Sequence, residues 1–179
     1  LGIEKNKITY LNHHYSHIMY SIYSNPELLD PSLVFCMEGY GGKSNGSISL
    51  FKNGEVTTLY ETPFCWIGRL YRYMTLLLGM KSNEHEYKVM GLAPYASEYI
   101  IKKPLEIFRE TAFVDGLEIK FHHKPKDIYF YFKEKLEPYR FDGIAGALQK
   151  YTEEIICQWV TNAIEKTEVN KDWSLDEWQ

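Results

Sequence analysis

The alternation of apolar and polar positions predicts a chain of mixed strands and helices. Short apolar runs at residues 8–11 and 33–37 are typical of strands. The Asn53-Gly54 pair between the runs 47–51 and 55–61 favours a β-hairpin with a type I′ turn. Apolar residues at helical spacing predict helices over residues 13–24, 64–79, 84–93, 102–113 and 143–167. We therefore predict an α/β fold in which helices pack against a hairpin-containing sheet.

Residues that begin and end elements place several of these boundaries. Asn12 is a plausible N-cap for the first helix, and Gly79 is a plausible C-cap for the second. Pro26 and Pro31 bracket a loop. Asp115-Gly116 suggests a short hairpin within residues 114–126. Residues 124–139 show no clear period, and the polar tail 168–179 receives no assignment.

Composition narrows the class of protein. The chain has 179 residues with 45% hydrophobic and 25% charged residues, which suits one globular domain. Its formal charge of −4 argues against binding to nucleic acid by charge alone, which needs clustered Lys and Arg. No apolar run approaches the length of a membrane span.

Three cysteines indicate a reducing compartment. Cys36, Cys65 and Cys157 are far apart and form no C-x-x-C pair. Cys36 and Cys157 lie within apolar stretches, so we expect both to be small core residues. A cytoplasmic protein is the corresponding expectation.

The segment N-H-H-Y-S-H, residues 12–17, is the first candidate for chemistry. His13 and His17 are four residues apart on a helix, so both rings can reach one metal ion; His14 and His17 have a less suitable spacing. A zinc protease would need Glu in place of His14. The alternative is a polar patch or a helix cap, since no third ligand is evident nearby. The adjacent pair His122 and His123 points in two directions and is a poor candidate for a metal site.

The second candidate is the glycine-rich segment 38–46, which follows a buried strand. Glycines there let the backbone approach a phosphate and direct N–H groups at it. The segment is neither a Walker A loop nor a G-x-G-x-x-G turn, and a plain hairpin loop is the alternative. The candidate phosphate-binding residues are Glu38, Gly39, Gly41, Gly42 and Ser47.

The third candidate is E-H-E-Y-K-V-M-G-L-A-P-Y, residues 84–95. Glu86 and Lys88 are possible cleft residues within it. Glu84 and Lys88 also have the spacing of a surface ion pair, which is the structural alternative.

These three segments, in this order, resemble the NodU/CmcH-type O-carbamoyltransferases. The match to E-Y-K-V-M-G-L-A-P-Y is the most distinctive, and the resemblance runs from about residue 8 to residue 167. It implies that residues 1–167 are part of an N-terminal domain with the actin-like ATPase (RNase H-like) fold, in which two α/β lobes surround a nucleotide cleft. Residues 168–179 are then a tail.

The resemblance also implies a reaction. A YrdC-type domain makes carbamoyl-adenylate from ATP and carbamoyl phosphate, and the actin-like domain transfers the carbamoyl group to a hydroxyl of a small acceptor. His13 and His17 would bind a divalent metal, iron in the family, together with a later Asp. Gly39, Gly41 and Gly42 would contact the phosphates of the nucleotide.

Two substitutions and several missing parts depart from the family pattern. Glu38 stands where the family usually has Asp, and Ala96 stands where it has Gly. The first phosphate turn, the adenosine-binding turn, the third metal ligand and the YrdC-type domain are not in the chain. We therefore expect a piece of a larger enzyme that is inactive alone and binds metal weakly. The alternatives are a non-catalytic module with the same fold and a relative of the tRNA threonylcarbamoyl transferases.

Overall fold

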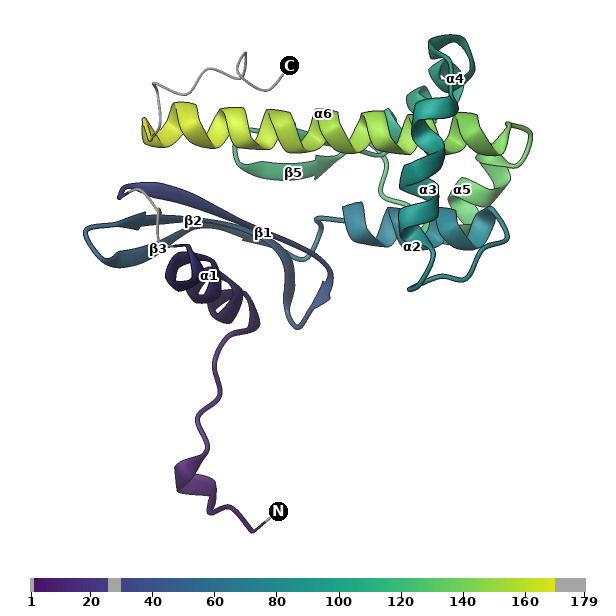
Figure 1. Ribbon diagram of the computed structural model, residues 1–179. Coiled ribbons are helices and arrows are strands. Elements are labelled where there is room, and N and C mark those ends of the chain that lie inside the picture. Colours follow the sequence, from purple (N-terminus) through teal and green to yellow (C-terminus); the bar gives the residue numbers. More distant parts are fainter. Residues whose placement is uncertain (1, 26–29, 170–179) are drawn as a thin grey trace.

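The long helix α6, Phe141–Thr167, joins two parts of the molecule in the computed structural model, which describes residues 2–25 and 30–169 (Figure 1). One part is an antiparallel sheet with helix α1 on its lower face in the view. The other is a group of shorter helices around the N-terminal half of α6. The chain is thus mixed α/β, as predicted, and its sheets are small and antiparallel.

The main sheet has the strand order β1-β2-β3, with bounds Ser32–Gly41, Ser44–Lys52 and Glu55–Thr62. The predicted hairpin is confirmed. Asn53 has φ 55° and Gly54 has φ 78°, the two positive values that a type I′ turn requires. This turn sets the register of β2 and β3.

The two faces of this sheet pack against different helices. Neighbouring strand residues point to opposite faces, so Val34 packs against α1 (His13–Ser24), whose buried residues include Ile18 and Ile22. Phe35 points the other way. Its ring lies edge-on to that of Trp159 in α6, with 5.9 Å between the ring centroids. The sheet is therefore held between α1 and α6.

The helical part contains α2 (Ile67–Leu77), α3 (Glu86–Leu92), the short 3-10 helix η2 (Ala93–Tyr95), α4 (Glu98–Arg109) and α5 (Ile128–Leu136). Their apolar faces share one core with the first half of α6. The apolar stripe predicted for α6 is buried throughout: Ile144, Leu148, Tyr151, Ile155, Trp159 and Ala163.

The prediction of a strand at residues 8–11 is wrong. This stretch follows a 3-10 turn, η1 (Lys5–Lys7), and runs to α1 without pairing to another strand among the described residues. Tyr10 is 90% exposed. An isolated extended segment has no neighbour for its backbone hydrogen bonds, so its β-branched residues are not enough to make it a strand.

The predicted helix 102–113 is displaced, and it ends earlier than expected. It begins at Glu98 and ends at Arg109, and residues 112–113 instead begin a strand. That strand, β4 (Ala112–Asp115), pairs with β5 (Glu118–Phe121) around Gly116, at φ 60°. The hairpin suggested at Asp115-Gly116 is therefore confirmed. The unassigned stretch 124–139 contains α5, which Asp127 caps by accepting a hydrogen bond from Phe130 N at 2.9 Å.

Two further expectations need correction. Cys36 and Cys65 are buried, but Cys157 is exposed because it lies on the outer side of α6. The glycine-rich segment is a tight hairpin rather than an open loop, since β1 continues to Gly41 and β2 begins at Ser44. Most of the loop expected between Pro26 and Pro31, and the tail beyond residue 169, lie outside the described residues.

None of the helices in the described part of the chain is long and apolar enough to cross a membrane.

Candidate metal centre

Helix α1 places its histidines through one cap and one narrow apolar stripe. Asn12 Oδ1 accepts a hydrogen bond from Tyr15 N at 3.0 Å, which begins the helix at His13 as predicted. Only one side of α1 is buried against the sheet, the side that carries His14, Ile18 and Ile22. His13 and His17 therefore lie on an exposed side of α1 that faces the end of β1.

The end of β1 places a third candidate metal ligand beside these histidines. Glu38 Oε2 lies 2.7 Å from His13 Nε2, and Glu38 Oε1 lies 2.7 Å from His17 Nε2. The ligand atoms of the three residues all lie within 4.8 Å of one another. The expectation that no third ligand is near the two histidines is therefore wrong. We call His13, His17 and Glu38 the triad.

The geometry of the triad suits a shared cation. The two Nε2 atoms are only 3.2 Å apart, and each also contacts a Glu38 oxygen. Each close contact with Glu38 can be satisfied either by an imidazole N–H or by a cation held between the groups. A metal ion between the three groups would accept both lone pairs and the negative charge together. Two imidazoles and one carboxylate are a donor set that zinc and non-haem iron both use.

Exposure differs within the triad. The histidine side chains are about half exposed, at 52% and 51%, whereas that of Glu38 is only 19% exposed. Cys36 lies beneath, with Sγ 4.0 Å from Glu38 Oε1. Burial, with a smaller contribution from the Glu38 charge, raises the pKa of the Cys36 thiol to about 11. This thiol is therefore protonated near neutral pH when no metal ion is bound.

His14 and Ser47 form a separate buried contact. His14 is 2% exposed, and its Nδ1 lies 2.8 Å from Ser47 Oγ. Ser47 was predicted to bind phosphate, but the structure places it against α1 and opposite Cys36, whereas the hairpin tip pairs Gly41 with Ser44. His14 is turned away from the triad, as its spacing suggested. The contact between the two residues attaches α1 to β2.

The glycine-rich hairpin lies against the start of α2. A Cβ atom on Gly68 would approach the backbone of Gly39 to 2.9 Å, so this crossing of β1 over α2 requires glycine. Arg69 Nε donates a hydrogen bond to Gly39 O at 3.1 Å. Gly41 ends β1, and Gly42 follows with φ 74°, which makes the turn. The predicted residues Glu38, Gly39, Gly41 and Gly42 thus lie together at one end of the sheet.

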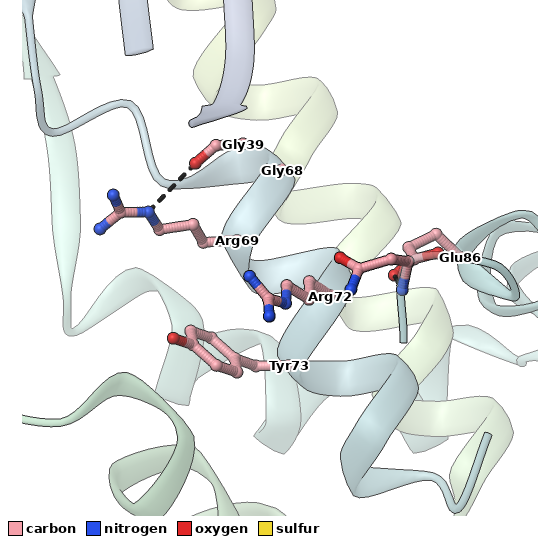
Figure 2. A pocket seen from close by; sticks show the side chains of 7 residues that line it. Gly39, Gly68, Arg69, Arg72, Tyr73 and Glu86 are labelled. Atoms are coloured by element: carbon pink, nitrogen blue, oxygen red, sulfur yellow. Dashed lines mark hydrogen bonds between the residues drawn. The ribbon is translucent and has the colours of Figure 1, made fainter. Parts of the chain in front are cut away.

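A cavity of about 660 Å³ opens beside Gly39 and is lined mainly by α2 (Figure 2). Of the two cleft residues predicted in the third segment, Glu86 lines this cavity and Lys88 does not. Lys88 is exposed and lies 5.8 Å from the centroid of the Tyr87 ring. His122 and His123 stack on two different rings, those of Phe113 and Tyr131 respectively, and do not form a pair.

Sequence reasoning missed the two arginines of the cavity, Arg69 and Arg72. Their spacing of three residues on a predicted helix was visible, because such residues share one face. Nothing in the sequence showed that this face lies beside the glycine-rich hairpin.

The comparison with known proteins agrees with the motifs. A family model that describes the N-terminus of carbamoyltransferases matches residues 2–172. The chain belongs to the carbamoyltransferase family. The triad and the arginine-lined cavity both lie inside the matched region.

Individual relatives are more distant. An uncharacterized protein of Synechocystis is 37% identical over 84 residues, 46% of this chain and 13% of that protein. The nodulation protein NolNO of Sinorhizobium fredii is 33% identical over 118 residues, 65% of this chain and 17% of that protein. An uncharacterized protein of Methanocaldococcus jannaschii is 23% identical over 191 residues, 94% of this chain and 30% of that protein. The chain spans less than a third of the length of these relatives.

Proposed function

We propose that the chain supplies a metal centre and part of the nucleotide site of an enzyme that carbamoylates a hydroxyl group of a small molecule. In this proposal the carbamoyl donor is carbamoyl-adenylate, made from ATP and carbamoyl phosphate. Family membership supports the transfer of a carbamoyl group. The single observation that supports the site is the convergence of His13, His17 and Glu38.

His13, His17 and Glu38 would bind a divalent metal, for which iron is the proposed identity. A metal held there would withdraw charge from the carbamoyl carbonyl or from the adenylate phosphate. The three side chains would be held in place before any ion arrives, because α1 and β1 are packed together and Asn12 caps α1. Such pre-organisation favours a defined coordination geometry.

The hairpin tip is proposed to contact the phosphates of the nucleotide through its backbone. Gly39, Gly41 and Gly42 have no side chain to exclude a ligand, and a Cβ at Gly42 would meet no heavy atom within 4 Å. N–H groups in such a turn can stabilise negative charge on a phosphate or a tetrahedral carbon. Ser47 is not included in this proposed contact because its hydroxyl is committed to His14.

The remaining elements of the nucleotide cleft are proposed to come from other parts of the enzyme. In that arrangement the present sheet and helices form a portion of an actin-like domain, and a YrdC-type domain supplies the adenylate. The acceptor hydroxyl would then attack the carbamoyl carbon close to the triad.

Metal analysis of purified protein tests the site. Wild-type chain, His13→Ala/His17→Ala and the control His122→Ala/His123→Ala would each be incubated with Fe²⁺ without oxygen, desalted and measured. The control removes the same number of histidines, but from rings that stack on Phe113 and Tyr131. We expect iron to remain with the wild type and the control only. Equal iron in all three proteins would refute the site.

Activity is tested in the whole enzyme that contains this sequence. Acceptor-dependent release of AMP from ATP and carbamoyl phosphate, abolished by His13→Ala/His17→Ala, is the expected result. Binding of neither substrate would instead indicate a non-catalytic module.

A further inference from the structure

The cavity beside Gly39 is distinct from the triad, although Glu38 and Gly39 are neighbours in the chain. Its lining consists of Gly39, Gly68, Arg69, Arg72, Tyr73, Asn83 and Glu86 and includes no member of the triad. Figure 2 shows Arg69, Arg72 and Tyr73 projecting from α2, with Arg69 about one turn before the other two. A ligand here would therefore contact α2 and the end of β1 rather than the two histidines.

Arg72 is a candidate anion-binding group in this cavity. Its side chain is exposed, and within residues 2–25 and 30–169 its guanidinium has no hydrogen-bond or ion-pair partner. Arg69 lies one turn earlier, and its Nε is bonded to Gly39 O at 3.1 Å. That bond holds a second guanidinium at the mouth of the same cavity. Arginine pairs with phosphate through two parallel N–H groups, so two arginines on one helix face favour a phosphate ligand.

Glu86 adds the opposite charge to the lining. Its Oε1 accepts a hydrogen bond from Asn83 N at 2.6 Å, which fixes the carboxylate. Arg72 and Glu86 line one cavity yet do not form an ion pair with each other. A ligand that bridges them needs an anionic group for the arginines and an N–H or O–H donor for the carboxylate.

We propose that this cavity binds a phosphate-bearing substrate, with the phosphate on Arg72 and Arg69 and a donor group of the same molecule on Glu86. The proposal rests on the proposed function for the choice of substrates. Carbamoyl phosphate offers a phosphate with an amide N–H₂, and a nucleotide offers a phosphate with ribose hydroxyls. This site shares Gly39 with the backbone contacts proposed for the hairpin tip, and it assigns specific side chains to phosphate recognition.

Isothermal titration of the full chain tests the proposal with three probes: inorganic phosphate, carbamoyl phosphate and AMP, at constant ionic strength. Arg72→Gln should weaken binding of all three by about tenfold, because a charge-assisted pair is lost. Arg72→Lys should lose less affinity for the three probes, since the positive charge remains. Lys166→Gln is the control, as it removes one exposed positive charge at the far end of α6. Unchanged affinity in Arg72→Gln, or no saturable binding by the wild type, overturns the proposal.

Glu86→Gln separates the two halves of the site. It should tighten binding of inorganic phosphate by several-fold, because a nearby negative charge is removed. The preference for carbamoyl phosphate or AMP over inorganic phosphate should fall, and the probe with the larger fall identifies the source of the phosphate. An unchanged preference for both probes overturns the role given to Glu86.

The same titrations in His13→Ala/His17→Ala distinguish this proposal from the metal centre. Phosphate binding that survives in this variant and is lost in Arg72→Gln supports the anion site even if no metal binds. Metal binding without any phosphate binding overturns the anion site and leaves the triad unaffected.

Discussion

The carboxylate of Glu38 in β1 lies 2.7 Å from Nε2 of His13 in α1, a residue 25 positions earlier in the chain. The contact depends on how α1 docks on the sheet, which Ile18, Ile22 and Val34 determine. Stability of this packing and the geometry of the triad are therefore coupled.

Glu38→Gln should lower metal affinity while leaving the fold intact. Gln keeps the size of the side chain but loses the charge that the cation needs. We expect the dissociation constant to rise on the order of tenfold or more, since even residues behind the ligands contribute that much. The measurement is competition with a metal chelator of known affinity. Glu55→Gln, an exposed carboxylate of β3, is the matched control. Equal affinities in the two variants would remove Glu38 from the metal centre.

Ser47→Ala should reduce stability without altering phosphate binding. Its hydroxyl bonds to buried His14, whose Nε2 already lacks a partner among the described residues. Removing Oγ leaves both ring nitrogens without a hydrogen-bond partner, at a cost of about 1–3 kcal/mol in the free energy of unfolding. Chemical denaturation measures the loss, and titration with inorganic phosphate should match the wild type. A selective loss of phosphate affinity would restore Ser47 as a phosphate ligand.

The sequence predicted much of the local structure because local rules determine it. Asn53-Gly54 has few alternatives to a type I′ turn, and the apolar stripe of α6 persists over about five turns, so both were predictable. The prediction of a strand at residues 8–11 failed, because a strand depends on a partner elsewhere in the chain. The start of α4 was also missed, because no side chain forms a hydrogen-bonded cap there.

The site was only partly predictable for the same reason. Helical spacing alone brought His13 and His17 together. Glu38 was recognised as a candidate, but as a phosphate contact, because its position relative to α1 is a property of packing. Arg72 was not recognised at all, since its role depends on the crossing of β1 over α2 at Gly68. Motifs thus indicated the chemistry, and tertiary contacts decided which residues meet.

Gly68→Ala should destabilise the protein and disturb the end of β1. The added Cβ would lie 2.9 Å from Gly39 Cα and N, a distance at which the backbone must shift. We expect a loss of about 1–3 kcal/mol, typical of overpacking. Gly91→Ala in α3 is the control, because its Cβ would meet no heavy atom within 4 Å. That variant should gain up to about 1 kcal/mol from helix propensity. Similar effects of the two substitutions would contradict the close crossing.

Tyr151 should make the free energy of unfolding decrease as the pH rises in the alkaline range. Burial raises the pKa of its phenol to about 12, and its hydroxyl donates a hydrogen bond to Ala112 O at 3.1 Å. Because the folded-state pKa lies above the unfolded value near 10, the contribution is complete below pH 10 and is lost as the pH rises through about 12. The difference between the folded and unfolded pKa values corresponds to roughly 2–3 kcal/mol in the free energy of unfolding.

Tyr151→Phe isolates this contribution from those of other titrating groups. At pH 8 the variant should be less stable than the wild type by about 1 kcal/mol, because Ala112 O loses its donor. Between pH 10 and pH 12 that deficit should shrink and then reverse, since Phe has no proton to lose from a buried position. Burial also raises the pKa of Cys65 to about 11. This thiol titrates in both proteins, so only its smaller charge interaction with Tyr151 remains in the difference. Urea denaturation at pH 8, 10 and 11.5 measures the trend. A deficit that stays constant across this range would mean that the Tyr151 phenol ionises with the same pKa in the folded and unfolded chains.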